Sequence, residues 1–129
     1  MLGDRRVHAI LPTHDVEALR PFYEETLGLT PFLVVPGVVL YRAGQGTIFG
    51  ISRSGGLASG AHTQVAFTVP DVAAEVAELR ARGVTFEAYE LPKTVDGVAE
   101  MPAGRAAWFK DPAGNLLGLI EFSKVEGAD

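Results

Sequence analysis

The chain has 129 residues, of which 47% are hydrophobic and 21% charged, a balance typical of a globular domain and not of a disordered protein. Its net charge of -5, without a basic run, argues against nucleic acid or an anionic membrane as partner. The absence of cysteine excludes disulfides, thiolate metal sites and a cysteine nucleophile. No apolar stretch approaches the roughly 20 residues that cross a bilayer, and residues 1–10 lack the apolar run of a signal peptide, so we expect a cytoplasmic protein.

The first half of the chain reads as a strand, a helix and three further strands. Asp15 is a favourable N-cap for a helix that runs through Leu19 and Tyr23 towards Gly28. Pro21 conflicts with a continuous helix because proline removes a backbone hydrogen bond, so we predict a kink or a restart there.

The second half repeats this order after a segment rich in glycine and serine, residues 52–60. Residues 64–69 alternate in the manner of a strand, with Val65, Phe67 and Val69 on the apolar face that should pack against the helix. Asp71 is then the expected N-cap of a helix over residues 72–82.

An internal duplication connects the two halves. A shift of 56 places residues 8–10 over residues 64–66, and a shift of 68 places residues 46–51 over residues 114–119. The larger second shift predicts a longer loop over about residues 90–104. Hairpin turns are expected at residues 43–46 and 111–114. We therefore predict an α+β fold of duplicated βαβββ modules, with a first module over residues 5–53 and a second over residues 63–122.

These motifs carry a family resemblance. Asp15, Tyr23 and Leu27-Gly28-Leu29, followed by the turn Asp111-Pro112-Ala113-Gly114-Asn115, resemble the vicinal-oxygen-chelate superfamily of glyoxalases, extradiol dioxygenases and bleomycin-resistance proteins. The resemblance covers residues 5–122 and implies a single domain over residues 1–129. It also implies a cupped, eight-stranded, barrel-like sheet with helices outside, usually in a homodimer. Whether the modules of one cup belong to one chain or are exchanged between two remains open.

The resemblance also places a metal site, because many members bind a divalent metal through side chains on the first and last strands of each module. In this sequence the corresponding positions hold His8, Gln64, Gly50 and Gly118. Glycine offers no side-chain ligand, and Glu121 lies an odd number of residues beyond Gly118, hence on the opposite strand face. We therefore predict a site without metal or other cofactor; the alternative is Fe, Mn, Ni or Zn held by His8 and Gln64.

Several side chains are candidates for a ligand-binding surface. If Gly50 faces a cavity, Tyr41 across the same hairpin should face it too. The internal repeat places Phe109 at the position equivalent to Tyr41, so Phe109 should face the cavity as well. A shift of one residue in the pairing would exchange Phe109 for Trp108. Adaptable Met101 in the long loop is a further candidate. The predicted ligand-binding set is His8, Tyr41, Gly50, Gln64, Met101, Trp108, Phe109 and Gly118.

The resemblance and these residues favour metal-independent binding of a small apolar or aromatic molecule, similar to drug-sequestering, bleomycin-resistance-like proteins. The alternative is an enzyme, a lyase, isomerase or dioxygenase that uses a metal at an unorthodox site or His8 as acid–base. A third alternative is an interaction module with a filled, vestigial cavity. The missing metal ligands favour binding over catalysis.

Overall fold

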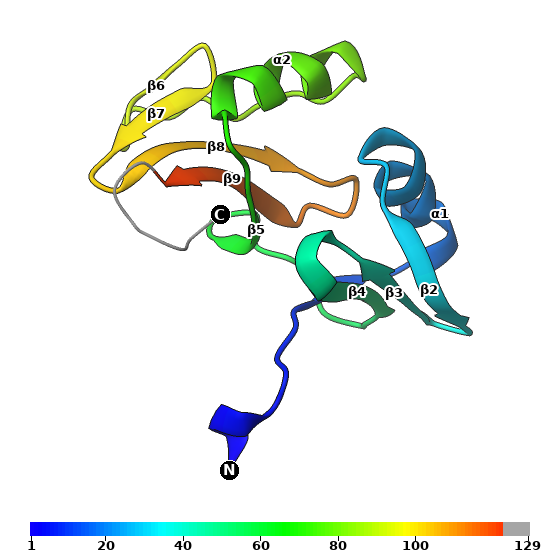
Figure 1. Cartoon of the computed structure of the whole chain (residues 1–129). Helices are drawn as coiled ribbons and strands as arrows, with labels where there is room; N and C mark the ends of the chain where they lie inside the picture. Colours follow the sequence, from blue (N-terminus) through cyan, green and yellow to red (C-terminus); the bar gives the residue numbers. More distant parts are fainter. Residues whose placement is uncertain (123–129) are drawn as a thin grey trace. The chain divides into compact units, whose positions relative to one another are not determined.

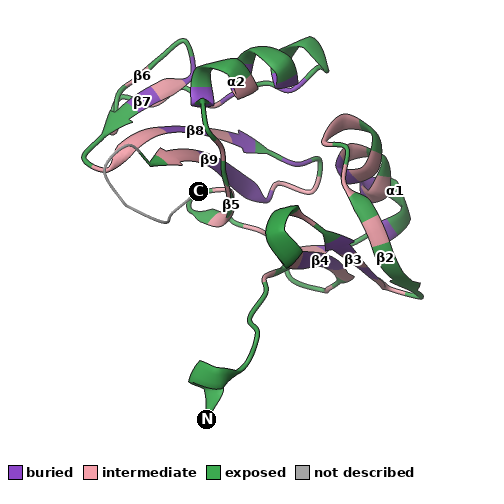
Figure 2. Ribbon diagram, in the orientation of Figure 1, coloured by how far each residue is buried: buried purple, intermediate pink, exposed green. Residues whose placement is uncertain are grey.

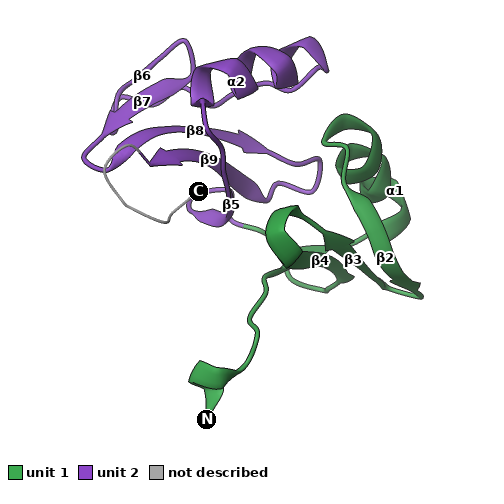
Figure 3. Ribbon diagram, viewed as in Figure 1, with its two compact units in different colours: residues 1–58 green, residues 59–129 purple. Residues whose placement is uncertain are grey.

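The computed structural model describes residues 1–122 and divides into two compact units, Met1–Ala58 and Ser59–Asp129 (Figure 3). We call them the first and the second module. Among the described residues, no helix is long and apolar enough to cross a membrane.

The first module is a four-stranded sheet with one helical segment (Figure 1). The sheet order is β1-β4-β3-β2, with β1 parallel to β4 and the other pairs antiparallel. Its elements are η1 (Leu2–Asp4), β1 (Ile10–Thr13), α1 (Val16–Pro21), the π-helical turn η2 (Phe22–Thr26), β2 (Thr30–Val35), β3 (Val38–Arg42), the 3-10 turn η3 (Gly44–Gly46) and β4 (Ile48–Arg53).

The predicted interruption at Pro21 is confirmed, and its form is a change of helix type. Asp15 caps α1 by accepting a hydrogen bond from the Ala18 amide at 3.1 Å. Proline has no amide hydrogen, so the α-helical ladder ends at Pro21 and a π turn follows, in which the Leu27 amide donates to the Phe22 carbonyl. Gly28, with φ of 75°, then turns the chain into β2.

One face of the first sheet is covered by α1 and η2, and the core lies between them (Figure 2). Tyr41 and Ile51 are fully buried in this layer, as is Tyr23 from η2. The rings of Tyr23 and Tyr41 stack with centroids 5.6 Å apart. This aromatic packing fixes which strand residues point towards the helix and which point away.

The second module has a five-stranded sheet in the order β5-β9-β8-β7-β6 and one helix, α2. Its elements are β5 (Thr63–Thr68), α2 (Val72–Ala81), β6 (Thr94–Val95), β7 (Val98–Met101), β8 (Gly104–Lys110) and β9 (Leu116–Phe122). The long loop predicted over residues 90–104 is in fact folded, because the Asp96-Gly97 pair, both with positive φ, joins β6 and β7 in a tight hairpin. Met101 is therefore a strand residue, and the described residues hold nine strands where eight were expected.

Capping is duplicated together with the fold. Asp71 accepts a hydrogen bond from the Ala74 amide at 3.2 Å, as Asp15 does in the first module. Val76 and Leu79 then bury the inner side of α2, over a sheet face that includes the fully buried Phe109. The predicted α+β fold of duplicated βαβββ modules is confirmed, with β6 as an additional edge strand in the second module.

The strand pairing confirms both shifts of the internal repeat. Ile10 pairs with Gly50 in the first module, and Ala66 pairs with Gly118 in the second. These pairs are related by the shifts of 56 and 68 that the sequence showed.

Candidate functional site

The face of each sheet that its helix leaves uncovered is the candidate ligand surface. In the second module, Trp108 lies opposite Gly118 in the β8–β9 ladder, and Gly118 lies beside Ala66 of β5. Directly paired residues share a face, so these three lie on the side opposite the buried Phe109. We call this surface, with Thr63 and Tyr89, the Trp108 face.

The Trp108 indole is held on this face by two contacts. Its Nε1 donates a hydrogen bond to the Thr63 hydroxyl at 3.1 Å, and its ring meets Tyr89 edge-on with centroids 5.6 Å apart. A Cβ at Gly118 would lie 3.6 Å from Trp108 Cδ1, an ordinary van der Waals distance, so the indole lies close over this glycine. The result is a half-buried, oriented aromatic surface.

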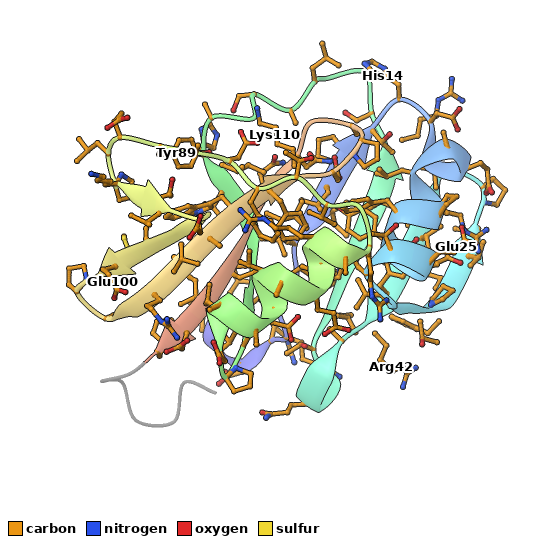
Figure 4. All side chains as sticks on the ribbon, turned by 90° about the horizontal axis from the view of Figure 1, so that it is seen from above. His14, Glu25, Arg42, Tyr89, Glu100 and Lys110 are labelled. Carbon is orange, nitrogen blue, oxygen red and sulfur yellow. The ribbon has the colours of Figure 1, made fainter. Side chains whose placement is uncertain are left out.

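Charged groups border the Trp108 face. Lys110 lies two residues beyond Trp108 on the same side of β8 and forms an ion pair with Glu87 at 3.4 Å. Figure 4 shows Tyr89 and Lys110 near one another. Burial and the Glu87 carboxylate raise the pKa of Tyr89, so its hydroxyl stays protonated at neutral pH and can donate a hydrogen bond.

Gln64 does not lie on this face, although strand alternation placed it there. The β5–β9 pairing shifts between Thr63 and Val65, which makes Gln64 a bulge residue. Its side-chain nitrogen donates to Asn115 Oδ1 at 3.0 Å, and its side-chain oxygen accepts from the Leu116 amide at 3.2 Å. The bulge brings Thr63 to the face in place of Gln64.

The turn that Gln64 contacts is a buried polar network. Asn115 is 0% exposed and Asp111 4% exposed. The Asp111 carboxylate accepts from the Ala113 and Asn115 amides at 2.9 and 3.0 Å, and from the Asn115 side chain at 2.8 Å. In this structure the Asp-Pro-Ala-Gly-Asn motif is therefore a fold element that sets the start of β9.

In the first module the corresponding face is aliphatic. Gly50 pairs with Leu40 and Ile10, not with Tyr41. A Cβ at Gly50 would lie 2.5 Å from Leu40 Cδ2 and 3.1 Å from Ile10 Cδ1, so these side chains cover the glycine. Gly50 therefore does not leave the open floor that its small size suggested. Leu33 and Val35 of β2 extend this face and are 40% and 43% exposed.

The predicted inward positions of Tyr41 and Phe109 are wrong, because both hairpins pair one residue out of the assumed register. Tyr41 pairs with Phe49 and Phe109 with Leu117, each on the helix-covered side. Both rings are 0% exposed and belong to the cores. The alternative register, which selected Trp108, is the one found.

Tyr41 has a partner within its own core. Its hydroxyl donates to Glu24 at 2.9 Å, and Arg20 donates to the same carboxylate at 2.7 Å. The Arg20 hydrogen bond lowers the pKa of Glu24, whereas burial raises the pKa of Tyr41. This network ties η2 to β3.

The remaining predicted residues lie at the margins. His8 is exposed and precedes β1, which begins at Ile10. Met101 is 38% exposed and pairs with Gly104. Trp108 lies four residues after Gly104 along β8, so Met101 and Trp108 lie on the same face of the sheet. Sequence reasoning missed Thr63 and Tyr89: no pattern reveals the bulge that exposes Thr63, and Tyr89 precedes the β6–β7 hairpin that was taken for a loop.

The residues at the superfamily's metal positions do not form a ligand set. Gly50 and Gly118 have no side chain, and both polar ends of the Gln64 amide are engaged with Asn115 and Leu116. Glu121 lies on the opposite side of the sheet, where its carboxylate accepts from the Val72 amide at 3.0 Å and from Arg105 at 2.9 Å. Within residues 1–122, no three histidine or acidic side chains gather in a way that could hold a metal ion.

Solved structures with the same fold include proteins of different activities. TnmS3, an antibiotic binding protein from Streptomyces sp. CB03234, is 28% identical, with 92% of this chain and 97% of that chain covered at a TM-score of 0.72. A glyoxalase/bleomycin resistance protein from the same organism is also 28% identical, with 89% and 98% covered and a TM-score of 0.66. Lactoylglutathione lyase from Agrobacterium tumefaciens is 21% identical, with 92% and 93% covered and a TM-score of 0.65, a likeness of fold alone.

A comparison with curated protein sequences finds no match. The model of the Glyoxalase/Bleomycin resistance protein/Dioxygenase superfamily, by contrast, matches residues 5–119, which is most of the chain. Together with the two βαβββ modules, this match identifies the chain as a member of the Glyoxalase/Bleomycin resistance protein/Dioxygenase superfamily.

Proposed function

We propose that this protein binds a small, planar aromatic molecule without a metal and that the Trp108 face holds it. The observation that carries this proposal is the fixed Trp108 indole, which offers a flat apolar surface whose edge is already tied to Thr63. Aromatic rings prefer such offset or edge contacts, which add about 0.5–1.5 kcal/mol to the burial of apolar area.

Polar groups beside the indole would orient the ligand. The Thr63 oxygen accepts from Trp108, which leaves the hydroxyl hydrogen free to donate to a ligand acceptor. Tyr89 offers a second donor at the edge of the same face. A flat ring system carrying hydrogen-bond acceptors suits this combination of apolar surface and donors.

The likeness to an antibiotic binding protein at 28% identity supports binding over catalysis. Sequestering a molecule requires affinity and no chemical step, so a sequestering protein can have glycines at the positions of metal ligands without losing its function. The homodimer and the cytoplasmic location expected from the sequence remain predictions.

Fluorescence gives a direct test, because Trp108 is the only tryptophan of the chain. A panel of aromatic antibiotics should include compounds that quench Trp108 emission in a saturable manner. Calorimetry with the best of these should show that Trp108→Leu weakens binding by about tenfold, the loss expected when a stacking partner is removed.

A matched control separates this site from general apolar adsorption. Leu91 is 93% exposed in the same module and is not part of the Trp108 face. Leu91→Ala should leave the affinity unchanged. An equal loss in both variants, or saturable binding that survives Trp108→Leu intact, would refute the assignment.

A further inference from the structure

A groove lies on the other side of the second sheet, between α2 and the β6–β7 hairpin, with a volume of about 680 Å³. Ala73, Val76 and Ala77 line it from one side of α2, and Val95 and Val98 line it from the hairpin. Figure 1 shows α2 beside β6 and β7. The small side chains of the two alanines fill little of the groove on the helix side, so an apolar chain has room to lie there.

The groove does not belong to the Trp108 face. Arg105 lines it, and Arg105 bonds to Glu121 and to Asp71, the N-cap of α2, so the groove is on the helix side of the sheet. Trp108 lies an odd number of residues from Arg105 along β8 and therefore points to the opposite side.

Arg80 is held in place at this groove. Its guanidinium carbon lies 5.7 Å from the centroid of the Phe86 ring. The guanidinium also lies close to Gly97, because a Cβ added at Gly97 would be 3.0 Å from Arg80 Nη2. The tight Asp96-Gly97 turn thus leaves a space that the guanidinium uses, and the charged group loses little further freedom when it binds a partner.

The charges around the groove are unevenly compensated. Arg105 has two carboxylate partners, Glu121 at 2.9 Å and Asp71 at 3.4 Å. Among the part of the chain that the structure describes, neither Arg80 nor Lys93 forms an ion pair.

Two acidic residues also line the groove and limit what it can accept. Glu100 lies directly opposite Arg105 in the β7–β8 ladder and interacts with its charge. Figure 4 shows Glu100 at the edge of the second module. Asp96 is the other acid in the lining. The lining residues themselves comprise three cations, Arg80, Lys93 and Arg105, and two acids, so together they carry one net positive charge.

We propose that this groove binds a small organic anion, a carboxylate with a short aliphatic chain. The carboxylate would sit on the forked donors of Arg80, with Lys93 adding positive charge, and the chain would cover the alanines of α2. Arginine binds carboxylates with two parallel hydrogen bonds, and Arg80 is exposed with its guanidinium over the Phe86 ring. This site is independent of the Trp108 face and needs no metal.

Hexanoate is a suitable probe, and its neutral match is hexanamide. In amide NMR spectra of the full chain, hexanoate should cause saturable shifts at Ala73, Ala77 and Gly97. Hexanamide should bind at least about tenfold more weakly, as expected for the loss of a charge-assisted hydrogen bond. The Arg80→Gln variant should weaken hexanoate binding to a similar degree.

Arg82→Gln is the matched control. It removes the same charge from the same end of α2, but Arg82 pairs with Glu78 and does not line the groove. Hexanoate should bind to this variant as to the unmodified chain. Equal binding of hexanoate and hexanamide, equal losses in the two arginine variants, or no saturable shift at the groove would each overturn the proposal.

Discussion

Replacing Asn115 by alanine should strongly destabilise the second module, because its side chain joins two parts of a buried network. It donates to the Asp111 carboxylate at 2.8 Å and accepts from Gln64 at 3.0 Å. A hydrogen bond to a charged group contributes about 1.5–3 kcal/mol and a neutral one about 0.5–1.5 kcal/mol. Since Asn115 is 0% and Asp111 4% exposed, water cannot readily replace these bonds, and we expect a loss of about 2–4 kcal/mol in the free energy of unfolding.

Urea unfolding of the Asn115→Ala, Gln64→Ala and double variants measures this quantity. Gln64 is only half-buried, so Gln64→Ala should cost about 1 kcal/mol, and the double variant should cost less than the sum of the two single variants. If Asn115→Ala cost under about 0.5 kcal/mol, or the two losses were additive, the network would not hold the turn.

Three further predictions concern other parts of the chain. Burial raises the pKa of Tyr41, so the stability that its protonated hydroxyl contributes should be complete below about pH 10 and fall as the pH rises further. In thermal unfolding, the melting temperature of Tyr41→Phe should therefore decline less steeply with alkaline pH than that of the unmodified chain. At neutral pH its melting temperature should be lower, because the hydrogen bond to Glu24 is lost. Gly50→Ala should cost about 1–3 kcal/mol in urea unfolding, because the new methyl group would meet a side-chain carbon at 2.5 Å and a backbone oxygen at 3.0 Å; an unchanged stability would show that this sheet face is loosely packed. Gly118→Ala meets nothing closer than 3.3 Å, so it should cost under about 1 kcal/mol yet shift the emission of Trp108, and an unshifted spectrum would contradict the close contact between them.

The sequence predicted the two modules more reliably than which side chains lie on each face of their sheets. The duplication appears in the sequence as matching local patterns, such as the capping aspartates Asp15 and Asp71, and the structure confirms both caps. The aromatic candidates Tyr41 and Phe109 depended on hairpin register, where a shift of one residue exchanges the two faces of a strand. Turn composition alone did not determine that shift.

Gln64 illustrates a second limit. Alternation along β5 placed it on the ligand face, but a bulge turned its side chain towards Asn115 and brought Thr63 forward. A bulge depends on the partner strand and on what the displaced side chain can bind, which are long-range features. At the metal positions the sequence predicts only that a glycine such as Gly118 has no side-chain ligand to offer, and the metal-free site stays a prediction.

Metal-independent binding of an aromatic ligand is the central claim, and one calorimetric titration tests it most directly. The best Trp108-quenching compound would be titrated into protein purified without chelator, before and after EDTA treatment, with the metal content of the same samples measured. We predict substoichiometric transition metal and an affinity that EDTA leaves unchanged. Stoichiometric metal together with loss of binding after its removal would contradict the claim and favour the metal-dependent enzyme.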